Sequence, residues 1–139
     1  MPDIYVDVGP MAYNKDTTKV AFKYAGGAQK QMRDAAIKAI RSAPGFTPDK
    51  VGNPEGYSFN AKLTEITFGT YKGQPSVTCK VNGEVTTYPT PKMLTTSLPG
   101  SATVAGGTTD RDVEDCVKAA MTATVKERVI PYLKTKPTA

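Results

Sequence analysis

The stretch from Tyr57 to Val104 constrains the fold of this chain most strongly, because its apolar residues alternate with polar ones. Alternation of this kind is typical of β-strands that bury one face and expose the other. Turn residues, among them Lys72-Gly73-Gln74, divide the stretch into pieces of strand length. The stretch therefore predicts three antiparallel strands that follow one another as a meander.

The first of these strands contains a change of parity. Phe59 and Leu63 share one face, whereas Ile66 and Phe68 fall on the opposite face of an ideal strand. A β-bulge, which adds one residue to a strand, would return the two later residues to the core face. We therefore expect a bulge near Thr64-Glu65.

The position of the second turn has two interpretations. Asn82-Gly83 between alternating runs is a strong signal for a two-residue hairpin, but it would leave strands of only about six residues. The alternative continues the strand to Thr87 and turns within Tyr88 to Pro91, where two prolines would stop ladder hydrogen bonding. We favour the second interpretation, in which Met93 to Val104 forms the last strand.

Two further strands are expected before the meander. Ile4 to Val8 alternates until Gly9-Pro10 interrupts it, and Val20 to Tyr24 alternates again, so the two can pair as a hairpin. Phe46 to Gly56 is rich in proline and glycine and shows no period. We expect no regular structure there, with Phe46 folding back as an anchor.

Two stretches have the three- and four-residue spacing of an amphipathic helix, Ala28 to Ala43 and Asp110 to Ile130. Pro44 ends the first of them. Thr109 is placed to cap the second, and Pro131 is expected to kink or end it. Each helix needs an apolar surface to cover, and one face of the sheet provides it.

The predicted fold is therefore a single α+β domain over residues 1–139, in which two helices pack on one face of an antiparallel sheet. The sheet has about five strands, in the order strand, strand, helix, three strands, helix. This size and order resemble small α+β modules of bacterial envelope proteins, a likeness of fold alone. The expected core comprises the same-face residues Met32, Ala36, Ile40, Phe59, Leu63, Val77, Val81, Val117, Ala120 and Met121.

The chain contains no histidine, which excludes many reactions. The chain therefore cannot use imidazole as a metal ligand, in a Ser-His or Cys-His pair, or as a general acid or base. The acidic residues Asp110, Asp112, Glu114 and Asp115 lack the glycine and the final glutamate of a calcium loop, and acids at a helix start usually serve the helix dipole. We expect no metal, no cofactor and no enzymatic activity.

The two cysteines, Cys79 and Cys116, are both predicted on core-facing positions, one on a central strand and one on the last helix. A disulfide between them is one interpretation, and two buried thiols are the other. Their spacing is not that of a Cys-x-x-Cys redox motif.

Basic residues give the chain a formal net charge of +5 and are spread along its length. The most basic surface is expected on the first helix, at Lys30, Arg33, Lys38 and Arg41. Weak nucleic-acid binding through this surface is therefore an alternative function. The spacing of these residues is that of a solvated helix face, and no run of aromatic and basic residues accompanies it.

By elimination, the sequence favours a non-enzymatic binding or assembly module that contacts an unidentified protein partner through its sheet edge and loops. The nineteen threonines favour an exported or periplasmic protein over a cytoplasmic one. The start, Met1 to Gly9, lacks the layout of a signal peptide, and no run of 18 apolar residues predicts a membrane span. The sequence leaves the oligomeric state open.

Overall fold

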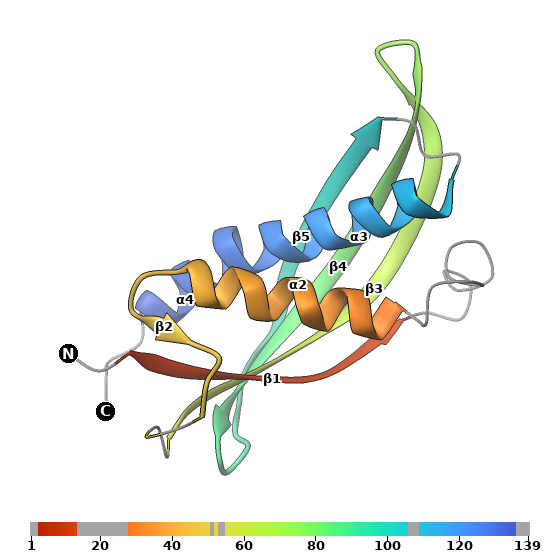
Figure 1. Cartoon of the computed structure of the whole chain (residues 1–139). Coiled ribbons are helices and arrows are strands. Elements are labelled where there is room, and N and C mark those ends of the chain that lie inside the picture. Colours follow the sequence, from red (N-terminus) through yellow and green to blue (C-terminus); the bar gives the residue numbers. More distant parts are fainter. Residues whose placement is uncertain (1–2, 14–27, 51, 53–54, 106–108, 136–139) are drawn as a thin grey trace.

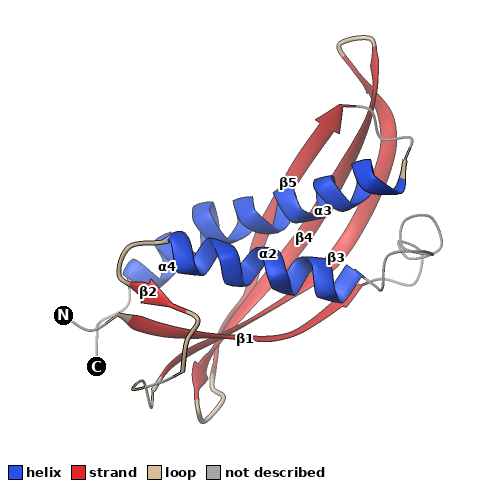
Figure 2. Ribbon diagram, viewed as in Figure 1, coloured by secondary structure: helices blue, strands red, loops and turns tan. Residues whose placement is uncertain are grey.

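The computed structural model describes residues 3–13, 28–50, 52, 55–105 and 109–135, in which helices cover one face of a five-stranded sheet (Figure 1). The strands are β1 (Ile4–Tyr13), β2 (Phe46–Thr47), β3 (Gly56–Tyr71), β4 (Gln74–Tyr88) and β5 (Met93–Ala105). The helical elements are α2 (Ala28–Ser42), α3 (Asp110–Thr124), the π-helical turn η1 (Val125–Val129) and α4 (Ile130–Lys134). Figure 2 shows the helices together on one side of the sheet, as predicted.

The sheet is mixed, so the prediction of a purely antiparallel sheet is wrong. Its order is β2-β1-β3-β4-β5, and β1 runs parallel to both β2 and β3. The helix α2 lies between β1 and β3 in the chain, and a crossover of this kind returns the chain to the sheet in the same direction. The predicted hairpin partner of β1, Val20 to Tyr24, lies outside the described residues.

The meander is confirmed, with β3, β4 and β5 in antiparallel register. The register shifts between Leu63 and Glu65, which is the predicted bulge. β4 continues through Asn82-Gly83 to Tyr88, so the favoured interpretation of the second turn is correct. Gly83 is not a turn residue. It packs under Phe59, because a Cβ atom at this position would lie 2.7 Å from Phe59 Cε1.

The turn predicted at Lys72-Gly73-Gln74 closes the hairpin between β3 and β4, and it consists of two residues, because Gln74 already belongs to β4. Tyr71 pairs with Gln74, and the two residues between them have positive φ angles, 52° at Lys72 and 78° at Gly73. Two consecutive positive φ angles match the right-handed twist of the flanking strands. The hairpin can therefore continue as a regular ribbon beyond the helices (Figure 1).

Two segments before β3 differ from their prediction. β1 does not end at Gly9-Pro10 but continues to Tyr13, with a register shift between Val8 and Met11. Phe46–Thr47 forms the short strand β2, although this stretch was expected to lack regular structure. Two residues are too few to show a period in sequence. Phe46 itself is buried, as the predicted anchor.

Helix α3 begins at the predicted cap, and helical structure continues after it past Pro131. The Thr109 hydroxyl accepts a hydrogen bond from the Asp112 main-chain N–H, with an N–O distance of 3.2 Å, which confirms the predicted cap. Pro131 does not end the helix. The preceding turn widens to a π-helix, in which the Ile130 N–H donates to the Val125 oxygen, and helical structure continues to Lys134.

The core lies between the helices and the covered face of the sheet. Leu63 and Phe59 of β3 are fully buried there, beneath Met32 and Ile40 of α2 and Met121 of α3. All ten residues predicted for the core are buried. No helix in the described ranges is long and apolar enough to span a membrane.

Candidate functional site

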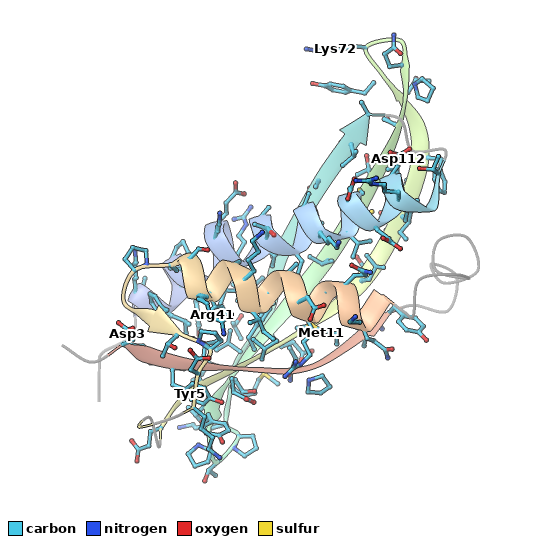
Figure 3. The ribbon with its side chains drawn as sticks, in the orientation of Figure 1. Asp3, Tyr5, Met11, Arg41, Lys72 and Asp112 are labelled. Carbon is cyan, nitrogen blue, oxygen red and sulfur yellow. The ribbon has the colours of Figure 1, made fainter. Side chains whose placement is uncertain are left out.

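The projecting end of the β3–β4 hairpin exposes aromatic side chains. Phe68 is 47% exposed and Tyr71 is 58% exposed, and both belong to the end of β3 that leads into the turn. The Lys72 Nζ atom lies 5.4 Å from the centroid of the Tyr71 ring, a cation–π contact. Figure 3 shows Lys72 at the hairpin tip, away from the helices. Alternation along β3 places Phe68 and Tyr71 on opposite faces of the hairpin, and we call these two residues together with Lys72 the hairpin patch.

Phe68 shows why sequence parity alone did not identify this patch. The bulge places Phe68 on the core face, opposite the buried Val77 of β4. Parity therefore predicted a core residue. The helix α3 covers only part of the hairpin, and how much it covers depends on where it crosses the sheet. The turn residues Lys72-Gly73 were the available signal for an exposed tip.

The sheet edge at β5 is the second surface that the predicted function needs. β5 is the outermost strand in the described part of the chain. Its exposed side chains include Ser101 and Thr103, and Met93 is 51% exposed. An edge strand presents main-chain N–H and C=O groups on its outer side, which are able to pair with another strand.

The predicted cysteine pair meets in the core. Cys79 and Cys116 are both fully buried. The Cys116 thiol lies 3.4 Å from the main-chain oxygens of Val77 and of Ala102, to which it can donate. A hydrogen bond with Cys116, and then burial, raise the pKa of the Cys79 thiol. Both cysteines are free thiols in this structure, and the disulfide stays a prediction.

The predicted basic surface is exposed along α2, at Lys30, Arg33, Lys38 and Arg41. The Arg41 guanidinium makes an ion pair with Asp49, at 3.1 Å between Nη2 and Oδ1. Both side chains of the pair are more than half exposed, at 61% and 65%, so the pair contributes little stability. Phe59, which base stacking would need at the surface, is fully buried.

A shallow hollow of about 250 Å³ lies on the sheet between β1, β3 and β4. Pro10 and Ala12 of β1, Asn60 and Lys62 of β3 and Glu84 of β4 contribute to its lining. Asn60 Oδ1 is buried and has no hydrogen-bond partner among the described residues. This oxygen is pressed against the β1 backbone, because a Cβ atom at Gly9 would overlap it. The oxygen therefore packs against the strand and does not define a ligand site.

A polar cluster on β1 was not predicted. Tyr5 is only 4% exposed, and its hydroxyl donates to Asp7 at 2.9 Å. Its ring meets the Tyr88 ring edge to face, with centroids 5.2 Å apart. Burial, the Asp7 hydrogen bond and the Asp7 charge raise the pKa of Tyr5 to about 12. In Figure 3, Tyr5 lies on the side of β1 opposite α2, and there its ring packs against Tyr88 at the end of β4.

No protein-family model matches this sequence, and no curated protein matches it. Solved structures do match. The hypothetical protein CT253 from Chlamydia trachomatis is 12% identical, with a TM-score of 0.70 over 96% of this chain and 99% of that chain. Protein XCC0632 from Xanthomonas campestris, of family DUF330, is 14% identical, with a TM-score of 0.58 over 96% and 87%.

A candidate lipoprotein from Caulobacter crescentus CB15 also matches, with 11% identity and a TM-score of 0.55 over 96% of this chain and 93% of that one. The fold is therefore a mixed α+β fold that uncharacterised and lipoprotein-like bacterial proteins share. At these identities the likeness establishes the fold alone.

Proposed function

We propose that this chain is a non-enzymatic binding or assembly module of the bacterial cell envelope, which contacts a protein partner through the hairpin patch and the β5 edge. The single observation that carries the proposal is the exposure of Phe68 and Tyr71 on a hairpin that extends past the helices. Large aromatic side chains are enriched at protein interfaces, where their burial contributes most of the binding energy.

The envelope location rests on the fold. Structures that share it include a candidate lipoprotein and proteins of unassigned role. Fractionation of cells that express the protein from its natural gene tests this part directly. Recovery with the envelope or periplasm is expected, and recovery with the cytosol alone would contradict it.

A photo-crosslinking amino acid at position 72, within the hairpin patch, tests the contact surface in cells. We expect crosslinked protein adducts that disappear when Phe68→Ser and Tyr71→Ser are combined, because both aromatic anchors are then removed. The same crosslinker at Lys38, which is exposed on α2, is the matched control. Equal adducts from both positions, or adducts that survive the double substitution, would refute the role of the hairpin patch.

Weak nucleic-acid binding is the alternative, and the four exposed basic residues of α2 are the observation that favours it. Such binding would be electrostatic, without sequence preference, and physiological salt would abolish it. Nucleic-acid adducts from the Lys38 position, in place of protein adducts from position 72, would favour this alternative.

A further inference from the structure

The strand β5 carries no charged residue in any of its 13 positions. The other long strands all carry charge: Asp7 lies in β1, Lys62 and Glu65 in β3, and Lys80 and Glu84 in β4. Edge strands usually carry charges, lysine above all, because these prevent pairing with another chain. The strand with the open edge therefore lacks the protection that its neighbours have.

The unprotected edge is regular over Gly100–Ala105. These six residues pair one by one with Val81 back to Ser76 of β4, and no bulge interrupts them. The register shifts of this pair lie further on, between Gly83 and Thr86. Pro99, which cannot donate a main-chain hydrogen bond, comes directly before this segment. The segment Gly100–Ala105 therefore has the regular backbone that pairing with a further strand requires.

The side chains of this segment suit pairing with an identical strand. Thr67, Thr78 and Thr103 form one row across β3, β4 and β5, and the hydroxyl oxygens of Thr78 and Thr103 lie 2.8 Å apart. The row ends at the open edge with the exposed Thr103. On the opposite face the segment presents the small, half-buried side chains Ala102 and Val104.

We propose that the occupant of this edge is a second copy of the chain, whose Ser101–Ala105 pairs antiparallel with the first across a two-fold axis at Thr103, so that Thr103 faces Thr103. In such an interface each residue faces one from the same segment, so a single charge would meet a like charge nearby. This segment has none. Facing threonines can also exchange hydrogen bonds and continue the row from one copy into the other.

This inference rests on the proposed function in one respect, since it takes the sheet edge as a contact surface and names the partner there. Pairing of five residues buries less than the roughly 800 Å² per partner of a standard stable interface. The dimer is therefore expected to form and dissociate with concentration, with a dissociation constant of roughly micromolar or weaker.

Sedimentation equilibrium of the whole chain over a wide concentration range tests the inference. The wild type should pass from monomer to dimer mass. Thr103→Lys should weaken association roughly tenfold or more, because two lysines would face each other across the axis. Thr67→Lys is the matched control, because Thr67 belongs to the same threonine row and is exposed, but lies two strands from the edge. Its association should equal that of the wild type.

Amide hydrogen exchange provides a second measurement that does not depend on a variant. Main-chain N–H groups of a strand point alternately to its two sides, so the amides of residues 101–105 that point away from β4 should exchange more slowly at concentrations where the dimer forms. A wild type that is monomeric throughout would overturn the inference and leave this edge to an extended segment of another protein. A dimer that survives Thr103→Lys, with no change in exchange at these amides, would also overturn it.

The hairpin substitutions separate this inference from the proposed function. Phe68→Ser with Tyr71→Ser should leave the dimer intact while the crosslinks at position 72 disappear. Loss of the dimer in that variant would place the self-contact on the hairpin patch and refute pairing at β5. Failure of the β5 test alone leaves the role of the hairpin patch standing.

Discussion

Leu63 of β3 is fully buried and pairs with Val81 across the sheet. Leu63→Ala removes apolar contacts and leaves a cavity, so the free energy of unfolding should fall by roughly 2–5 kcal/mol. Lys62→Ala is the control, because Lys62 is the exposed neighbour on the same strand. Urea unfolding measures both. A loss below about half a kilocalorie per mole at Leu63, as for ordinary surface substitutions, would show that its side chain does not face the core.

Tyr5 should make stability depend on alkaline pH. Its hydroxyl is protonated in the folded protein up to a pKa of about 12, whereas an unfolded tyrosine ionises near pH 10. Its contribution is therefore complete below about pH 10 and is lost as the pH rises towards 12. Tyr5→Phe removes this ionisation, and at neutral pH it should cost roughly 1 kcal/mol through the lost hydrogen bond to Asp7.

The measurement is the difference in unfolding free energy between wild type and Tyr5→Phe, followed from pH 8 to pH 12. Lysines and other tyrosines titrate in both proteins, so the difference isolates Tyr5. It should shrink as the pH rises above about 10. A difference that stays constant with pH would show that the hydroxyl is not held as the structure places it.

At the scale of elements, the contact of α3 with β5 depends on a glycine. A Cβ atom at Gly100 would overlap the Thr124 hydroxyl and lie 3.0 Å from Thr124 Cα. Thr124 is fully buried, and its hydroxyl donates to the Ala120 oxygen at 2.7 Å, so it has no room to move. The absence of a side chain at Gly100 therefore lets the helix lie close to the edge strand.

Gly100→Ala should consequently lower the free energy of unfolding by roughly 1–3 kcal/mol, the usual effect of overpacking. Gly69→Ala is the matched control, because nothing lies within 4 Å of a Cβ atom there, and it should be neutral or slightly stabilising. Denaturant midpoints of the two variants give the comparison. Equal midpoints would mean that α3 does not approach β5 at Gly100.

At the scale of the whole molecule, Cys79 and Cys116 connect the fold to its compartment. An oxidant that accepts two electrons and two protons from the thiols would join them and close a loop of nearly 40 residues. In the chain-entropy model this stabilises the protein by about 3–4 kcal/mol. We expect the bridge in an oxidising compartment, because cytosolic thiols are normally kept reduced.

Thiol labelling of the protein from an oxidising expression host measures this directly. Neither cysteine should react in the folded protein, because both are fully buried, and neither should react after unfolding without reductant. Reductant should then release two thiols and lower the melting temperature. Two reactive thiols in the unfolded, unreduced protein would exclude the bridge.

The sequence by itself determined the elements whose signals are local. The bulge beside Leu63, the Lys72-Gly73 turn and the Thr109 cap follow from parity, turn chemistry and side-chain hydrogen bonding within a few residues. The core was predictable for the same reason, since the period of each element shows which of its side chains share a face. Even the meeting of Cys79 and Cys116 followed from two inward positions.

Only the tertiary structure decided what depends on residues distant in sequence. The direction of β1 was one such feature, because alternation is the same in a parallel and an antiparallel strand. The role of Gly83 was another such feature, because the ring of Phe59 leaves no room for a side chain at this position. The sequence showed only that the prolines after Tyr88 are a better turn signal than Asn82-Gly83. The exposure of Phe68 depends on where α3 begins, and the burial of Tyr5 depends on Tyr88 at the end of β4. Burial is a property of the packed molecule, whereas periodicity is a property of the single strand.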